Sequence, residues 1–260
     1  MDEVFVALEA LDRLARTQRG QGRNSYIVLG ATSHTDTWNN YFKDKFKNVL
    51  KPDLFISHGH YLLGDPELEA CVIIPPTLLR KRRGSRAYVH DLTDAAAAIS
   101  AIASDASAPL LSLSVGMKGR WTKPLDNQRL QVFAQCKRNE PAQFFGSYTD
   151  VCNKEPYRSN MVNQLNPENA HTTDKNARLM FVFDSSASLN EKLCLLKADH
   201  TSVRFGLAVY DLDYEDYNDT CRWQNSVGGF GRVQTVRSLL NFFVTNYTDA
   251  TKLDACRRLY

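Results

Sequence analysis

The sequence predicts an α/β protein built around a parallel β-sheet. Short apolar runs alternate with amphipathic helical patterns, and strands that alternate with helices usually pair in parallel. The 260 residues are 43% hydrophobic, which is enough for a large core. A long polar stretch, residues 121–180, separates the third predicted strand from its helix and is expected to form an insertion lobe. The four predicted strand-helix units fit either a small open sheet or half of a (β/α)8 barrel.

The first part of the chain is expected to begin with a helix and to continue with two strands. Apolar residues recur at helical spacing before the glycines at 20 and 22: Val4, Phe5, Leu8, Leu11 and Leu14. The apolar run 26–30 predicts the first strand. A second amphipathic pattern runs from Trp38 to Val49 and predicts a helix that ends before Pro52, and residues 53–57 predict the second strand.

The third unit contains an alanine-rich helix and a strand. Residues 91–103 have the composition of a strong helix former, and either Asp91 or Thr93 can cap its N-terminus. The apolar run 110–115 follows directly and predicts the third strand.

The fourth unit follows the polar insertion. Ser188 and Glu191 predict a capping box for a helix that runs through Ala198. The last strand is expected at 205–212 and a final helix at 232–246. The expected organisation has three parts: strand-helix units in 1–120, an insertion lobe in 121–180, and the last helix, strand and helix in 181–260.

Composition and charge lower the expectation of several function classes. The formal net charge of +3 is too small to predict a nucleic-acid partner, and no apolar run approaches the roughly 20 residues of a membrane span. Six cysteines without a C-x-x-C pair disfavour a zinc or dithiol site and allow up to three disulfides. No secretion signal follows Met1, so either the chain is cytosolic or its true N-terminus is missing.

Three acids follow the last predicted strand at every second position. If the strand continued, Asp211, Asp213 and Glu215 would share one side of its carboxyl end, where parallel sheets carry their chemistry. The stretch DLDYE resembles the catalytic D-x-D-x-E core of glycoside hydrolase family 18, in which the glutamate protonates the glycosidic oxygen. That signature ends the fourth barrel strand, whereas only residues 216–260 follow here, and Ala208 stands where it opens with Asp. These three acids are therefore only the alternative catalytic assignment.

Five segments in chain order resemble segments of family 18 chitinases beyond that signature. Two are residues 5–16, which resemble the N-F-V-x-L-L-x-E-L-R helix after the catalytic fourth strand, and residues 112–120, which resemble the seventh-strand L-G-x-P-x-Y-G-R. The others are 145–152, similar to A-Y-x-E-x-C of the insertion domain, 183–192, similar to Y-D-D-x-x-S-x-x-x-K, and 206–217, similar to the last-strand G-x-M-V-W-x-L-D-x-D-D-F. The chain departs from these patterns at Lys118, Asp150 and Tyr210, which replace Tyr, Glu and Trp. The resemblance is to arthropod chitinase-like proteins.

The resemblance implies a partial (β/α)8 TIM barrel: the C-terminal half, with four parallel strands and a chitinase-type insertion lobe. The strand with D-x-x-D-x-D-x-E would then lie upstream of Met1. The chain is therefore expected to be inactive as a glycosidase and to need no cofactor. An extracellular location is expected if a longer precursor carries a signal peptide.

The resemblance also implies residues that bind chitin or N-acetylglucosamine oligosaccharides. His60 stands where the sixth-strand M-x-Y motif has the tyrosine that holds the substrate's N-acetyl group, and His58 stands at the methionine. Tyr210 replaces the tryptophan under the reacting sugar, and Arg120 and Trp121 are expected at the same rim. The alternative for Tyr210 and Trp121 is that both rings pack in the core.

A metal-dependent hydrolase of the amidohydrolase type is the competing interpretation. His58 and His60 form H-x-H at a strand end, and Asp211 or Asp213 could supply a last-strand ligand. Such a site needs further histidines at strand ends, whereas His90 and His200 are predicted to flank helices.

Overall fold

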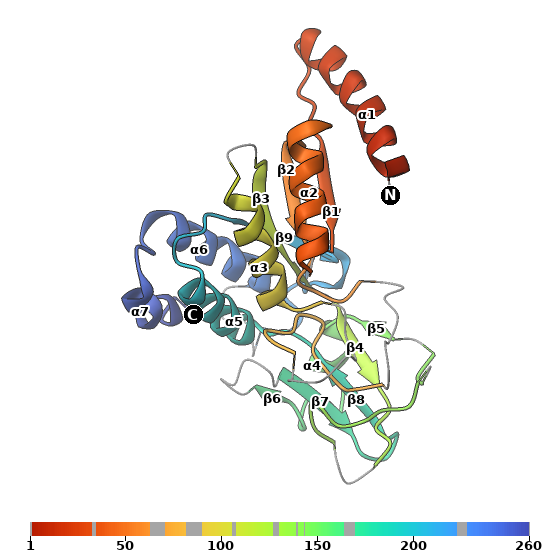
Figure 1. Ribbon diagram of the computed structural model, residues 1–260. Coiled ribbons are helices and arrows are strands. Elements are labelled where there is room, and N and C mark those ends of the chain that lie inside the picture. Colours follow the sequence, from red (N-terminus) through yellow and green to blue (C-terminus); the bar gives the residue numbers. More distant parts are fainter. Residues whose placement is uncertain are drawn as a thin grey trace.

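The computed structural model describes residues 2–32, 35–62, 71–81, 90–105, 108–126, 130–138, 140–142, 144–163, 170–222 and 228–259. These residues form a four-stranded parallel sheet and a five-stranded antiparallel sheet. Figure 1 shows the antiparallel sheet beyond the carboxyl ends of the parallel strands. Among the described helices, none is both long and apolar enough to cross a bilayer.

The parallel sheet consists of β1 (Val28–Ala31), β2 (Leu54–Ser57), β3 (Leu110–Gly116) and β9 (Gly206–Tyr210), in that spatial order. Each strand pairs in parallel with the next one. The order follows the chain without reversing, which confirms the predicted arrangement and excludes a doubly wound sheet. The last strand ends earlier than predicted, because Asp211 adopts the left-handed conformation with φ 59°.

The sheet is curved. Its two edge strands are β1 and β9, yet a Cβ built on Gly30 of β1 would lie only 3.2 Å from the Tyr210 hydroxyl of β9. In a flat sheet, three strand spacings would separate these strands by about 14 Å, too far for one tyrosine side chain to cross. The four strands therefore form an arc, as expected for part of a barrel.

Three helices lie in the first part of the chain: α1 (Asp2–Gly20), α2 (Asp36–Asn48) and α3 (Leu92–Ala103). Asp91 caps α3 by accepting a hydrogen bond from Asp94 N at 2.6 Å, which decides between the two predicted caps. Helix α1 projects beyond one end of the sheet (Figure 1). Its Leu11 and Leu14 are exposed, so much of its predicted apolar face is uncovered, whereas Phe5 packs against α2.

The later helices are α5 (Ser186–Asp199), α6 (Gly231–Thr245) and α7 (Leu253–Arg257), with a 3-10 turn, η2 (Ala250–Lys252), before α7. The capping box predicted from Ser188 and Glu191 is wrong. Ser185 is the cap, and Ser188 is its partner three residues later, because the chain turns into the helix earlier than expected. Glu191 instead pairs with Arg257 of α7, a short helix that the sequence patterns did not predict.

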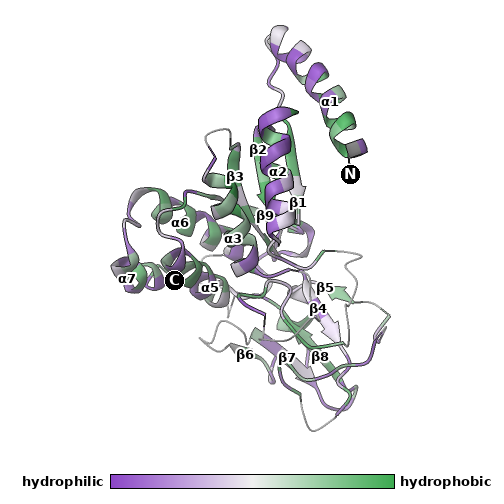
Figure 2. Ribbon diagram, viewed as in Figure 1, coloured by the Kyte–Doolittle hydropathy of each residue, from purple (hydrophilic) through white to green (hydrophobic). Residues whose placement is uncertain are grey.

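The main core lies between the sheet and the helices. Strand residues Phe55 and Leu113 and the α3 residue Ile99 are fully buried there. Burying a side chain of this size stabilises the fold by about 1.5–3 kcal/mol. In Figure 2, β2 is green, whereas α2, which lies in front of it, shows a largely purple outer face. The helical spacing of α2's aromatics thus serves to bury Phe42 and Phe46.

The antiparallel sheet forms a lobe directly after β3. Its strands are β4 (Gly119–Thr122), β5 (Phe145–Gly146), β6 (Val162–Asn163), β7 (Ala170–Asp174) and β8 (Leu179–Val182), in the order β5-β4-β8-β7-β6, and a short helix, α4 (Thr149–Cys152), follows β5. Two disulfides tie the lobe to loops that follow β2 and β9: Cys71–Cys136 and Cys152–Cys221. A third, Cys194–Cys256, joins α5 to α7. The lobe is thus fixed over the carboxyl ends of the strands.

Candidate functional site

The carboxyl ends of the parallel strands bring polar and aromatic side chains together. We call these residues the strand-end cluster: His58, His60, His90, Ser114, Lys118, Tyr210 and Asp211. They come from β3 and β9, from the segments after β2, β3 and β9, and from the residue before the cap of α3. Loops at this end of a parallel α/β sheet are where ligands bind, so the cluster is the candidate site.

His60 is the most enclosed member of the cluster and has no exposed surface. Its Nδ1 lies 2.7 Å from Ser114 Oγ, and that oxygen already accepts a hydrogen bond from Gly59 N. The direction of this contact depends on the tautomer of the ring: where the Ser114 hydroxyl donates to Nδ1, the ring proton lies on Nε2. Burial, together with His58, Lys118 and His90, lowers the pKa of His60 to about 3, so the ring is neutral. Its buried Nε2 makes no hydrogen bond within the described residues.

The Asp211 carboxylate lies near His60 Nε2, the ring nitrogen that does not contact Ser114. Its Oδ2 lies 4.0 Å from His60 Nε2 and 3.4 Å from Lys118 Nζ. The same ammonium lies 4.2 Å from the centre of the Phe145 ring, a cation-π contact. Burial raises the pKa of Asp211, and Lys118 opposes that shift. A Cβ on Gly116 would meet both His60 and Asp211, so the glycine lets the two side chains approach β3.

Tyr210 lies across the cluster. Its ring centre is 4.8 Å from that of His60 and 5.8 Å from that of His58, and its side chain is only partly buried. His90 completes the aromatic group, with its ring centre 6.2 Å from that of His58 and its Nδ1 3.3 Å from Thr32 Oγ1. The phenol is thus only half buried at the carboxyl end of β9.

The acids that follow Tyr210 do not share one side of a strand as predicted. After Asp211 the chain turns into a 3-10 helix, η1 (Leu212–Tyr214), so Asp213 is exposed to solvent. Glu215 is buried, forms an ion pair with Arg232 Nη2 at 2.5 Å and accepts a hydrogen bond from Arg232 N at the start of α6. Residues in a turn do not alternate between two faces as residues in a strand do. Of the three acids, only Asp211 therefore reaches the cluster.

Arg120 and Trp121 lie on β4, outside the strand-end cluster. Arg120 is 1% exposed, donates to Val72 O at 3.4 Å and lies over the Tyr61 ring. Trp121 packs against Phe181 and Tyr157 in the lobe, where it lines a cleft of about 530 Å³ with five other residues: Pro141, Asp150, Lys154, Tyr157 and Leu179. No residue of the cluster lines that cleft.

A metal site finds no support in the described part of the chain. It contains no group of three or more His, Cys, Asp or Glu side chains that could hold an ion. His60 uses Nδ1 for Ser114, and Asp213 points to solvent from η1. His90 and His200 flank α3 and α5, as predicted, but His90 also belongs to the cluster.

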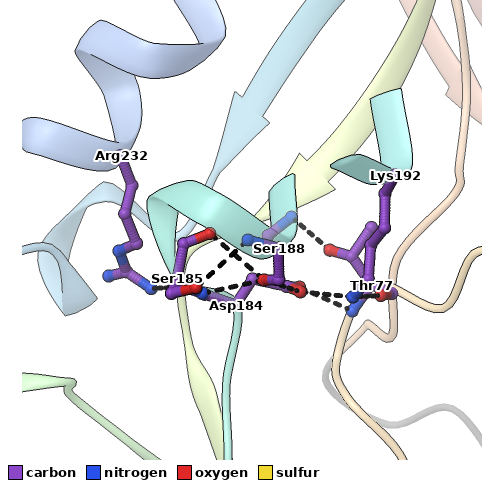
Figure 3. A network of polar contacts seen from close by, with 7 residues as sticks. Thr77, Asp184, Ser185, Ser188, Lys192 and Arg232 are labelled. Carbon is purple, nitrogen blue, oxygen red and sulfur yellow. Dashed lines mark hydrogen bonds and ion pairs between the residues drawn. The ribbon is translucent and has the colours of Figure 1, made fainter. Parts of the chain in front are cut away.

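A second polar group lies next to the cluster and holds the scaffold. Figure 3 shows the Asp184 network: Thr77, Asp184, Ser185, Ser188, Lys192 and Arg232. Lys192 Nζ contacts Asp184 Oδ1 and donates to Thr77 O at 2.6 Å, while Thr77 N donates to Asp184 Oδ2 at 3.2 Å. Thr77 Oγ1 accepts a hydrogen bond from Gly116 N, which connects the network to the end of β3.

Several of these residues were not predicted from the sequence to be functional. Ser114 and Gly116 alternate as small residues along one face of β3, a period-2 signal that could have marked a ligand-facing surface. Lys118 was visible as a departure from the seventh-strand pattern, but not as a partner of Asp211. Thr77 lies in an irregular segment, for which the sequence offers no periodic signal.

No family model and no curated protein matches the chain. Solved structures do, beginning with the Group IV chitinase of Ostrinia furnacalis in complex with allosamidin, which is 14% identical, with 90% of this chain and 61% of that chain covered and a TM-score of 0.61. The chitinase-like agglutinin of Robinia pseudoacacia is 15% identical, with 89% and 61% covered and a TM-score of 0.54.

The family GH18 chitinase of Cycas revoluta, in a complex with allosamidin, is 15% identical, with 82% of this chain and 58% of that chain covered and a TM-score of 0.52. The chain therefore spans about three fifths of the length of these structures. At this low sequence identity, structural similarity identifies the fold alone. The four parallel strands and the lobe have the fold of the glycoside hydrolase family 18 chitinases, an arc of the (β/α)8 barrel with the chitinase-type insertion.

Proposed function

We propose that the protein is a chitinase-like binder of N-acetylglucosamine polymers that does not itself hydrolyse them. The observation that carries the proposal is the half-buried Tyr210 ring over the carboxyl ends of the strands. Aromatic faces stack on the apolar faces of sugars, and family 18 structures with this fold were solved with allosamidin or with an N-acetylglucosamine oligomer.

The polar residues beside Tyr210 suit an acetamido group. The imidazole of His60 is neutral, and its buried Nε2 has no hydrogen-bond partner in the described chain. In the tautomer protonated at Nε2, it would donate to the carbonyl oxygen of an N-acetyl group once the ligand displaces the side chains that enclose the ring. One tyrosine offers a smaller stacking surface than a tryptophan. We therefore expect an affinity in the millimolar range, about −4 kcal/mol.

The expected lack of hydrolysis follows from the acids near the cluster. Family 18 chemistry needs a carboxylic acid that protonates the glycosidic oxygen. Glu215 is paired with Arg232, Asp213 faces solvent, and Asp211 is paired with Lys118. The stretch DLDYE also does not complete the signature D-x-x-D-x-D-x-E, because Ala208 stands where the signature has its first Asp.

The test is a calorimetric titration with chitin pentasaccharide, using wild type, Tyr210→Ala and Trp121→Ala. We expect binding by wild type, loss of binding by Tyr210→Ala, and retention by Trp121→Ala, because Trp121 belongs to the lobe cleft. Trp121→Ala thus also tests the earlier assignment of that residue to the binding rim. If wild type does not bind, or folded Tyr210→Ala binds as tightly as wild type, the proposal is wrong. Turnover of the pentasaccharide that disappears in Glu215→Gln would contradict the non-catalytic part.

A further inference from the structure

Two residues that depart from the family 18 patterns, His60 and Lys118, meet Asp211 in one place. His60 and Lys118 stand where those patterns have tyrosine, and Asp211 follows the replaced tryptophan position. Asp211 Oδ2 lies 4.0 Å from His60 Nε2 and 3.4 Å from Lys118 Nζ. The chain thus has an ion pair beside the sugar-stacking ring Tyr210, and this pair changes what a ligand would meet.

The two charges of this pair are not equally accessible. The Asp211 side chain is 23% exposed, whereas that of Lys118 is 3% exposed. Lys118 is enclosed between the Asp211 carboxylate and the Phe145 ring. A ligand over Tyr210 therefore meets the carboxylate, and the ammonium that balances its charge lies beneath it.

The carboxylate has acceptor capacity left. A carboxylate offers about four lone-pair sites. Asp211 Oδ2 is buried, 3.4 Å from Lys118 Nζ and 4.0 Å from His60 Nε2, so the exposed 23% of the side chain lies on its other atoms and a ligand would approach Oδ1. Hydrogen bonds between an ammonium and a carboxylate are roughly twice as strong as neutral ones. The group that gains most from Asp211 is accordingly a protonated amine on the ligand.

We propose that Asp211 directs the strand-end cluster toward N-acetylglucosamine polymers that carry free amino groups, that is, partly de-N-acetylated chains. The inference rests on the proposed function, since the sugar ring stacks on Tyr210. Tyr210 holds any sugar of this series, and Asp211 selects among them. Asp211 is a specificity residue and not a catalytic one.

The test compares pentamers of glucosamine and of N-acetylglucosamine at one ionic strength, by calorimetric titration of wild type, Asp211→Asn and Asp211→Glu. Asparagine tolerates the left-handed backbone at this position, so Asp211→Asn is the substitution least disruptive to the fold. We expect Asp211→Asn to weaken glucosamine pentamer binding about tenfold and N-acetylglucosamine pentamer binding less than twofold. Asp211→Glu, which keeps the charge, should retain most of the selectivity.

The matched control is Asp254→Asn, which removes one exposed carboxylate from α7. A loss equal to that of Asp211→Asn would mean that net charge alone attracts the amine, and would overturn the inference. Equal losses of both pentamers in Asp211→Asn, or no loss of either, would also overturn it while leaving the proposed function intact. If wild type binds neither pentamer, both proposals fail.

Discussion

Two polar groups lie side by side at the carboxyl end of the sheet, and they differ in how fully their atoms are paired. In the Asp184 network, both carboxylate oxygens accept hydrogen bonds, and Lys192 bridges the carboxylate and Thr77 O, although Arg232 Nε at the edge of the network makes no hydrogen bond among the described residues. In the strand-end cluster, His60 Nε2 and Asp211 Oδ2 are buried without a hydrogen-bond partner among the described residues. Buried polar atoms without a partner are rare in native proteins.

The difference separates scaffold from site. A buried carboxylate whose two oxygens are both paired, as in Asp184, adds rigidity and keeps little capacity for a ligand. An incompletely paired one keeps donors and acceptors that a ligand can use, and the left-handed Asp211 beside it is the kind of backbone feature that gathers at functional sites. The following predictions test whether the two groups behave so differently.

The largest effect is expected for Lys192→Met in the Asp184 network. The substitution leaves the fully buried Asp184 carboxylate without its counter-charge or forces it to bind a proton, which should lower the free energy of unfolding by about 3–5 kcal/mol. Denaturant unfolding with the disulfides intact measures it. The double variant with Asp184→Asn should recover part of the loss, and a loss under about 1 kcal/mol in the single variant would show that this network is not the scaffold.

A smaller loss is expected for Glu215→Gln. The amide still accepts from Arg232 N, but the buried guanidinium loses its charged partner, so the free energy of unfolding should fall by about 2 kcal/mol. Asp213→Asn is the matched control, because an exposed acid two residues earlier should change it by less than about 0.5 kcal/mol. Equal effects of the two variants would place both acids in one environment, contrary to the structure.

The pH dependence of stability should report on His60. Its pKa is about 3 in the folded protein against an ordinary 6.5, so between these values the unfolded chain binds a proton that the folded one does not. Stability should therefore fall as the pH falls from 6.5 towards 3, by about 1.4 kcal/mol per pH unit from this residue. Unfolding curves at pH 7 and pH 5 should show this slope in wild type and a shallower one in His60→Gln. Parallel slopes would mean that His60 is not buried as a neutral ring.

The sequence predicted the repetitive elements and failed at irregular ones. Periodic apolar residues located all four parallel strands and the helices that cover them, because a long, repeated pattern outweighs local exceptions. The end of β9 was missed, since the turn at Asp211 depends on one residue's backbone conformation. The proposed boundaries of the insertion lobe, 121 and 180, remain a division drawn from loop length alone.

The candidate site was only partly predictable. His60 and Tyr210 were singled out by their places in family 18 motifs and Asp211 as one of the acids at the end of the last predicted strand, and the structure places the three together. Arg120 and Trp121 were assigned to the same rim from adjacent motif positions, but β4 carries them into the lobe. Their side chains point to different neighbours because successive strand residues face opposite sides, which sequence spacing shows only once the strand is known.

The most direct test of the ligand site is a magnetic-resonance titration of the histidine ring signals with chitin pentasaccharide. A ligand in the strand-end cluster should shift the His60 signals through the approach to Nε2. His200, which caps α5 and pairs with Ser100, is the internal control and should not move. Shifts of His60 with an unchanged His200 are the expected result. An unchanged His60 at saturating ligand, or equal shifts of both rings, would contradict the assignment of the strand-end cluster as the site.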